Sequence, residues 1–430
     1  MKVRRSWVRW TLGTVPLSAA LWAQAPAAVS LAQAQQIALR NHPRIASAEL
    51  AAKASGFVVK QVRSAYYPTV SGNVTGVGTE QGSVLSAGAV TTSSIYSRES
   101  NGLVANQLLS DFGRTASLEQ SAKLRNAAQN QNVSNTRAQV LVEVQQEYYR
   151  ALNTESILNV ARATLDLRRV TLRQVSALAA SALRSKVDVS FAQVNESQAQ
   201  LDLFRAENDA TASHARLSAA MGYDRDQAFS LSDEPLPPAL DPNVDALIEQ
   251  AKRERPDLAA LQLNKEALDR YADAERRLRN PTLSAAAVAG VAPVRDERLP
   301  ESYSAAGINL NIPILNGGLF KARQEEAESR AAAASKDLQD LSVQIARDVR
   351  VAWLDANDAF RRLDVTARMV GEAKEALRLA QARYENALGS IVELNQAQLN
   401  ETSAEIAAAS AKYEYLSRRA VLSYAMGALR

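Results

Sequence analysis

The chain contains one unit of about 200 residues twice, and this duplication limits the folds that are open to it. Residues 182–188 (ALRSKVD) recur 205 residues later as residues 387–393 (ALGSIVE), and residues 220–222 (AMG) recur at the same offset. Other landmarks recur in the same order: Val144 and Tyr148 as Val349 and Trp353, Gly113 as Gly318, Pro43 as Pro256, and Pro68 as Pro281. Both copies are therefore expected to adopt the same fold.

Each copy is predicted to form short helices, two strands and a long helical hairpin. Apolar residues that step by three and four predict the helices, and a change to alternation after Tyr67-Pro68 and Asn280-Pro281 predicts the strands. The first repeat is predicted at 29–222, with strands at about 69–79 and 100–109 and a helical hairpin at 115–220. A proline-rich linker follows at 223–242. The second repeat is predicted at 243–430, with strands at about 282–291 and 303–312 and a helical hairpin at 319–426.

The hairpin helices are too long for a compact domain. The helix predicted at 115–180 would be roughly 100 Å long at 1.5 Å per residue, so it must lie against partners along its length. Its heptad-like seam runs from Leu158 to Ala179, with one step through Arg168, which is a charged flaw in an apolar stripe. Small side chains such as the alanines at 331–334 let helices approach closely. The helices could form the wall of a tube or an antiparallel bundle with a solid core.

The predicted strands have two different faces. In 282–291 alternate residues are apolar throughout, and in 303–312 Ile308, Leu310 and Ile312 alternate with glycine and asparagine. This alternation fits a barrel with lipid outside and water inside. A barrel needs about eight strands or more, so two or more chains must contribute to it. Periodicity leaves open whether two chains or three do so.

The first 28 residues have the pattern of a secretory signal. A basic start is followed by an apolar stretch at 10–22 and by Ala23-Gln24-Ala25, a small-x-small cleavage site. The apolar stretch is shorter than the roughly 20 residues of a membrane-spanning helix. Without the four cations of this segment, 46 basic residues balance 46 acidic ones. The net charge therefore gives no reason to expect a nucleic-acid partner.

Residues that could carry chemistry are scarce. Cysteine is absent, which excludes disulfides, thiolate metal sites and a lipid anchor on an N-terminal cysteine. His42 and His214 are the only histidines, and they lie far apart in the sequence, so we expect surface or packing roles for them. No glycine-rich phosphate loop, paired-histidine metal motif or nucleophile elbow occurs. We therefore predict no catalytic residue, no cofactor and no metal site.

Taken together, several features match a known family. They are the two-fold repeat, the strand pairs after Tyr67-Pro68 and Asn280-Pro281, the Asp111-Phe112-Gly113-Arg114 turn, and the hairpin motif that contains Asp188 and Glu393. Their order and spacing resemble those of TolC-type outer-membrane efflux and secretion ducts over essentially the whole mature chain. The resemblance implies a mainly α-helical homotrimer. Its helical hairpins would form a periplasmic tunnel continuous with a twelve-stranded barrel in the outer membrane of a Gram-negative bacterium.

The resemblance implies a passive exit duct of a tripartite efflux pump or a type I secretion system. The expected partners are the other protomers, a periplasmic adaptor (membrane fusion) protein, an inner-membrane transporter and outer-membrane lipid. One alternative is a soluble periplasmic helical scaffold without channel activity, but a scaffold has no use for two alternating strand pairs. Another is a periplasmic adaptor, but adaptors carry one hairpin and this chain carries two.

The resemblance also places an aperture at the hairpin motif. Glu393 resembles an acid that narrows the aperture, Asp188 resembles its lock partner on the first hairpin, and Tyr384 resembles the locking tyrosine. Symmetry would repeat each acid around the tunnel, and rings of carboxylates select for cations and can gate. Ser185 with Asp188 and Ser390 with Glu393 also match a capping box, which would restart a helix at each place.

This chain departs from the family pattern at two positions. Gly389 stands where the relatives have an arginine, and Gln396 replaces a second acid. Arg184, in the first copy of the motif, is a candidate to supply the missing arginine. The hairpin tips, where we expect the adaptor to bind, comprise Ala182, Leu183 and Ser185 in the first copy and Ala387, Leu388, Gly389 and Ser390 in the second.

Overall fold

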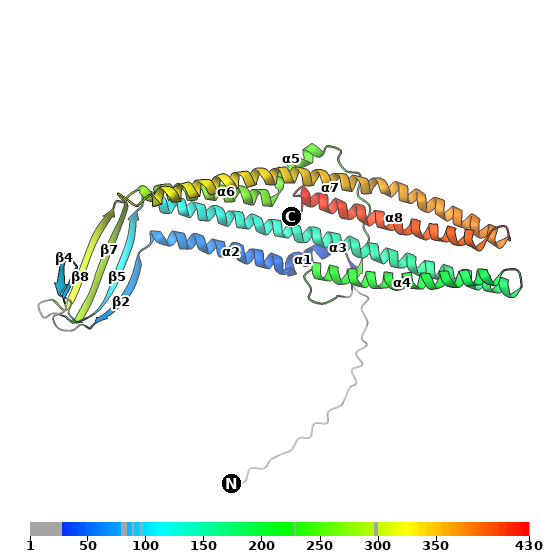
Figure 1. Cartoon of the computed structure of the whole chain (residues 1–430), viewed down its shortest axis with the longest axis horizontal. Helices are drawn as coiled ribbons and strands as arrows, with labels where there is room; N and C mark the ends of the chain where they lie inside the picture. The colour runs from blue at the N-terminus through cyan, green and yellow to red at the C-terminus, as the bar shows by residue number, and fades with distance from the viewer. Residues whose placement is uncertain are drawn as a thin grey trace, which may run out of the picture.

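The computed structural model describes residues 28–78, 84–87, 90–94, 97–227, 229–295 and 300–429. The predicted signal segment at 1–28 lies outside this part of the chain, apart from its last residue. The described chain is elongated. A β-sheet stands at one end, and long helices run away from it to two hairpin turns at the other end (Figure 1).

Each repeat folds into the same four helices. They are α1 (Leu31–Asn41), α2 (Pro43–Arg63), α3 (Arg114–Ala180) and α4 (Lys186–Ala220) in the first repeat, and α5 (Val244–Glu254), α6 (Pro256–Arg276), α7 (Leu319–Glu385) and α8 (Ile391–Ala425) in the second. Equivalent helices have 11, 21, 67 and 35 residues in both repeats. The 3₁₀ turns Ser64–Tyr66 and Arg277–Arg279 follow α2 and α6. The duplicated unit with long helical hairpins is confirmed.

The backbone angles repeat as closely as the helix lengths. Among the described residues eight have a positive φ, and these eight form four pairs that are each 205 residues apart. The pairs are Phe112 with Gly317, Gly113 with Gly318, Ala182 with Ala387, and Gly222 with Gly427. A left-handed backbone costs an L residue roughly 1–2 kcal/mol. Ala182 and Ala387, at 58° and 61°, therefore carry the same strain in the same turn.

The long helices pack side by side along their length. In each repeat the longest helix, α3 or α7, contacts the second helix near the sheet and its hairpin partner beyond the middle. α3 also contacts α6 and α8, and these contacts join the two repeats. None of the described helices contains a stretch long and apolar enough to cross a membrane.

Four long strands form one antiparallel sheet in the order β2-β5-β7-β8. Their bounds are Thr69–Val77 for β2, Arg98–Ser110 for β5, Thr282–Val294 for β7 and Ser302–Asn311 for β8. The central pair joins the repeats, with Leu103 opposite Ala289. Within the described residues β2 and β8 pair on one side only, so the sheet of one chain has two open edges.

Three local features of the structure were not predicted from the sequence. The stretch between the two strands predicted in the first repeat contains a short hairpin of β3 (Val84–Ala87) and β4 (Val90–Ser94). Two short strands, β1 (Ala28–Val29) and β6 (Ser230–Leu231), pair in parallel although they are far apart in sequence. β7 continues through Pro293, beyond the strand end predicted at about residue 291. A register shift opposite β5 interrupts the ladder there, and proline is tolerated at such irregularities.

Two equivalent apolar cores lie half-way along the long helices. In the first, α1 packs on α3, and Val144 and Leu217 are fully buried. In the second, α5 packs on α7, and Val349 and Leu422 take the equivalent places. These cores bury the short helices of each repeat against its long hairpin, so they hold the middle of the molecule together.

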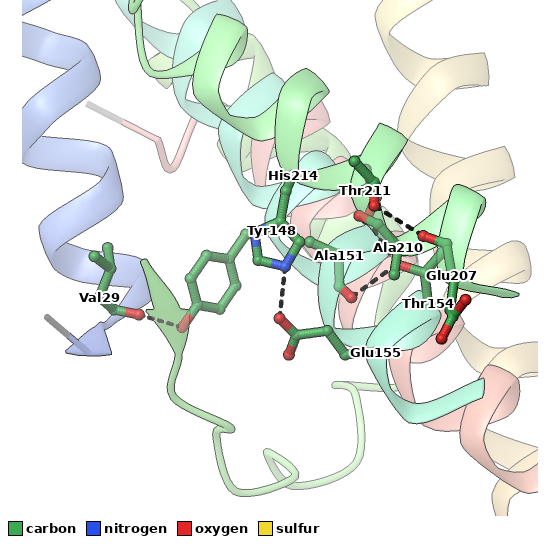
Figure 2. A network of polar contacts seen from close by, with 10 residues as sticks. Val29, Tyr148, Ala151, Thr154, Glu155, Glu207, Ala210, Thr211 and His214 are labelled. Carbon is green, nitrogen blue, oxygen red and sulfur yellow. Dashed lines mark hydrogen bonds and ion pairs between the residues drawn. The ribbon is translucent and has the colours of Figure 1, made fainter. Parts of the chain in front are cut away.

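The linker is tied to the first core by polar contacts. The buried Tyr148 places its hydroxyl 2.9 Å from the carbonyl oxygen of Val29 (Figure 2). The same hydroxyl lies 2.7 Å from the carbonyl oxygen of Ser232 in the linker. Nearby, His214 Nε2 lies 2.6 Å from the Glu155 carboxylate and links α4 to α3 (Figure 2). The other histidine, His42, caps α2, because its Nδ1 accepts a hydrogen bond from the backbone amide of Arg44 in the first turn of that helix. Both histidines thus make local structural contacts.

Candidate functional site

One face of the four-stranded sheet is apolar and open. The strand register places Val70, Ala105, Ala287 and Ala306 in one row across it. Other residues of this face are strongly exposed, with accessible fractions of 80% for Val74, 60% for Leu103 and 72% for Ile308. A water-soluble protein rarely exposes so many aliphatic side chains together. The face therefore requires an apolar surrounding.

The opposite face of the same sheet is polar. Thr69, Asn106, Ala286 and Gly307 form one row across it. Asn73, Ser71 and Ser284 lie on the same side because side chains alternate along each strand. Alternation of this kind separates lipid from water in membrane barrels. Because both edges of the sheet are open, its strands can pair with those of other copies.

The two flanks of the helical part are also unpartnered. Along α4 exposed apolar side chains recur at helical spacing, namely Val187, Phe191, Val194, Leu201 and Phe204. The exposed stripe of α7 consists of Val343, Val351, Leu354, Val365 and Leu379. Neither stripe is covered within the described chain. Stripes with this spacing are typical of helices that pack lengthwise on a neighbouring helix.

The hairpin tips are built by equivalent turns. Ala182 and Ala387 have left-handed backbones, and each is followed by an exposed leucine. Leu183 is 69% exposed and Leu388 is 72% exposed. The next helix begins after Ser185, whose side chain accepts from the Val187 backbone (3.1 Å), and after Ser390, whose side chain accepts from the Glu393 backbone (3.1 Å). All seven predicted tip residues therefore lie on the two turns.

Glu393 does not complete a capping box at its helix. Its carboxylate instead lies 2.9 Å from Arg383 Nε, near the end of α7. Arg383 also donates to the carbonyl oxygen of Leu388 (3.2 Å), so it bridges both sides of the second tip. A Cβ on Gly389 would lie only 3.1 Å from the Glu393 carboxylate. A glycine at this position thus leaves room for the ion pair, which the sequence analysis did not identify.

Arg184 and Tyr384 meet between the two hairpins. The guanidinium carbon of Arg184 lies 4.3 Å from the centroid of the Tyr384 ring, and Arg184 Nη2 donates to the Tyr384 carbonyl oxygen. The Tyr384 hydroxyl is buried and has no hydrogen-bond partner among the residues that the structure describes. Burial raises the pKa of Tyr384, the negative charge of Asp188 raises it further, and Arg184 lowers it. The structure therefore brings Arg184, Asp188 and Tyr384 together.

Gln396 lies outside this group. It is exposed on α8, and its amide donates to Asn400 (2.9 Å) one turn further along the same helix. A small apolar cluster supports the tip contact instead. It consists of Val175, Ala192, Tyr384, Ile391 and Leu394, which come from all four hairpin helices.

A buried polar layer lies deeper between the hairpins. Arg168 on α3 is buried and donates to Gln398 Oε1 on α8. The Gln398 amide donates in turn to Thr171 Oγ1 (3.1 Å). Burial lowers the pKa of the Arg168 guanidinium. In the sequence this layer was indicated only by Arg168, a charged residue that interrupts the apolar seam of its helix. No pattern in the sequence distinguished Gln398.

Comparison with known proteins identifies the family. A family model described as outer membrane efflux protein matches residues 23–223 and 247–428, which is most of both repeats. The chain belongs to the outer membrane efflux protein family. This is a family of outer-membrane channels and not a class of enzymes. The match in two segments agrees with the duplication.

One related protein and two solved structures resemble this chain over most of its length. Outer membrane protein TolC of Vibrio cholerae is 25% identical over 431 residues, which cover 97% of this chain and 93% of the relative. The fold is similar to that of a membrane protein from Pseudomonas aeruginosa, with a TM-score of 0.81 and 23% identity over 92% of this chain and 93% of that one. It is also similar to VceC of Vibrio cholerae, with a TM-score of 0.77 and 18% identity over 92% and 96%.

Proposed function

We propose that this protein is the exit duct of a tripartite efflux pump or a type I secretion system, and that it works as a passive homotrimeric channel. The observation that carries the proposal is the open sheet, which has one apolar and one polar face and continues directly into helices of about 100 Å. Three copies would supply twelve strands. The apolar face would then contact lipid, and the polar face would line a water-filled lumen.

The helical flanks support assembly from copies of the same chain. The unpartnered stripe of α4 on one flank and that of α7 on the other would cover each other around a closed ring. Heterologous contacts of this kind form a closed ring when a whole number of the rotations between neighbouring copies adds up to a full turn. The tube so formed would continue the lumen of the barrel into the periplasm.

Exposed aromatic residues support a membrane boundary where the sheet meets the helices. Tyr66 and Tyr67 follow α2 and precede β2, and Phe112 follows β5; all three are exposed. Aromatic side chains of membrane barrels gather at the level of the lipid headgroups. This position would place the sheet in the outer membrane and the helices in the periplasm.

The opposite end would receive substrate. We infer that the tips with Leu183 and Leu388 contact a periplasmic adaptor, because both leucines are exposed at the far end of the helices. Arg184, Asp188, Tyr384 and Glu393 would set the width of the aperture there. The inner-membrane transporter would deliver substrate through that adaptor.

The first test is the location and mass of the protein expressed with its complete N-terminus. We expect it in the outer-membrane fraction, with a detergent-corrected mass of three chains and stepwise conductance in planar lipid bilayers. A water-soluble monomer or dimer would overturn the proposal and favour the helical scaffold, although the scaffold would leave the apolar face of the sheet exposed to water.

A further inference from the structure

A single tyrosine crosses the polar face of the sheet. Tyr303 is the only aromatic residue in β2, β5, β7 and β8. The register places it opposite Gly290, which lies opposite Gly102, which lies opposite Asn73. The four residues form one row, and they share a face because directly paired residues point to the same side. This row lies near the end of the sheet that is remote from the helices.

The tyrosine side chain lies flat along this row. A Cβ placed on Gly290 would lie 2.5 Å from the Tyr303 hydroxyl oxygen and 2.6 Å from Cζ. A Cβ placed on Gly102, one strand further away, would lie 2.4 Å from the same hydroxyl oxygen. The ring therefore crosses β7 and its hydroxyl rests on β5. At Gly102 the tyrosine hydroxyl is the nearest atom, whereas a Cβ on Gly290 would also lie 2.3 Å from the Asn101 carbonyl oxygen, so the neighbouring strand requires that glycine as well.

Glycine elsewhere on this face has no such role. Gly307, on β8, also lies on the polar face, because it pairs with Ala286. A Cβ on Gly307 would meet no atom within 4 Å. Glycine weakens a strand interior unless a close approach requires it. Gly102 and Gly290 therefore leave the space in which the tyrosine ring lies.

We propose that Tyr303 determines the bore of the outlet, and that Gly102 and Gly290 keep the duct wide by letting its ring lie against the wall. This inference rests on the proposed function, in which the polar face lines the lumen. Each copy would then place one ring at the same level of the barrel. A side chain at position 102 would lift the ring away from the sheet and into the path of solutes.

The test compares four proteins in planar lipid bilayers. They are the wild type, Gly102→Ala, Gly102→Ala with Tyr303→Ala, and the control Gly307→Ala. We expect Gly102→Ala to lose conductance and to exclude a smaller polyethylene glycol than the wild type does. The double variant should regain both properties, because the lifted ring is gone. Gly307→Ala should match the wild type.

Each outcome decides a separate claim. A wild-type protein that forms no conducting channel overturns the proposed function and this inference with it. A conducting wild type whose Gly102→Ala variant behaves like Gly307→Ala overturns the inference alone. A double variant that remains as narrow as Gly102→Ala also overturns it, because the backbone contact of the new Cβ with the Ala289 carbonyl oxygen, at 2.9 Å, would then be the cause.

A second measurement does not depend on how Gly102→Ala folds. The chain has no cysteine, so a thiol reagent labels an introduced cysteine alone. We expect a bulky, charged thiosulfonate to reduce the conductance of Tyr303→Cys and to leave Ile308→Cys, on the apolar face, unchanged. Equal effects at both positions, or no effect at Tyr303→Cys, would overturn the placement of Tyr303 in the lumen.

Discussion

The guanidinium of Arg184 stacks on the ring of Tyr384, with 4.3 Å between its central carbon and the ring centroid. Arg184 lies at the tip of the first hairpin, and Tyr384 lies at the end of α7 in the second. Gly389 is the residue equivalent to Arg184, 205 residues later. The resemblance implies an arginine at the position of Gly389, and this chain has an arginine in the first copy of the motif instead. It contacts the tyrosine that the resemblance assigns to the lock.

Arg184→Ala should open the aperture. A cation–π contact contributes from about 0.5 to 2 kcal/mol, depending on exposure, and each 1.4 kcal/mol is about tenfold in an equilibrium. We expect a several-fold higher open probability in planar bilayers and little change in thermal stability. Lys186→Ala removes the same charge from the same tip without touching Tyr384, so it is the matched control. Equal open probabilities in the two variants would rule out the lock.

Glu393→Ala should raise conductance without weakening the fold. Its ion pair with Arg383 is exposed, and exposed pairs contribute about 0–1 kcal/mol to stability. We expect the unfolding midpoint to stay near that of the wild type, while single-channel current rises as a ring of carboxylates is lost. Glu375→Ala is the matched control, because it breaks a comparable exposed ion pair with Arg378 elsewhere on α7. Unchanged conductance in Glu393→Ala would exclude Glu393 from the aperture.

Arg168→Met should destabilise the hairpin pair more than a double substitution does. The single change leaves the buried Gln398 oxygen without its donor, which costs about 1–3 kcal/mol. Replacing both partners, as in Arg168→Met with Gln398→Leu, restores an apolar contact and should recover most of this loss. Circular dichroism melts in detergent would measure it. A double variant that is less stable than the single one would contradict this view of the polar layer.

Gly113→Ala should cost more stability than Gly318→Ala. Both glycines precede a 67-residue helix with a left-handed backbone, at φ 91° and 83°. Both substitutions therefore carry the backbone strain of roughly 1–2 kcal/mol. Only Gly113 adds a clash, because its Cβ would lie 2.1 Å from Arg277 Nη1, which donates to the Gly113 carbonyl oxygen. Melting curves that shift equally in both variants would show that Arg277 moves aside freely.

Tyr413 should make the protein less stable at alkaline pH. Burial and the negative charge of Asp233 raise the pKa of Tyr413 to about 12. In the unfolded chain a tyrosine loses its proton near pH 10. The stability that the neutral Tyr413 contributes is therefore complete below about pH 10 and is lost as the pH rises to about 12. Tyr413→Phe should melt with a weaker pH dependence in this range, and identical pH profiles would contradict the assignment.

Local signals account for most of what the sequence analysis predicted. The helical hairpins were predicted to within a few residues because apolar periodicity and the turns at Gly113, Gly222 and Pro256 are encoded locally. The same holds for the alternating faces of β7 and β8. The β3–β4 hairpin was missed because strands of four and five residues are too short to show a clear alternation. β1 and β6 were missed because a two-residue strand has no period.

The candidate site was predicted less completely. Asp188, Tyr384 and Arg184 were named from motif position, and the structure brings them together. Glu393 was named for the aperture, but its partner Arg383 was not, because a charge on an exposed helix face looks like any other solvated charge. Gln396 was named in place of an acid and lies away from the contact. Nothing in the sequence of β5 or β7 indicated that Gly102 and Gly290 accommodate the ring of Tyr303.

The sequence by itself determined the repeat, the lengths of the helices and the two-faced character of the strands. These properties depend on residues that are close along the chain, so periodicity and turn chemistry reveal them. The tertiary structure decided that β5 pairs with β7, that Arg184 meets Tyr384, and that Tyr303 lies across Gly290 and Gly102. Each of these contacts, apart from that of Tyr303 with Gly290, joins residues of different repeats. Only packing across the whole chain brings such distant residues within reach of one another.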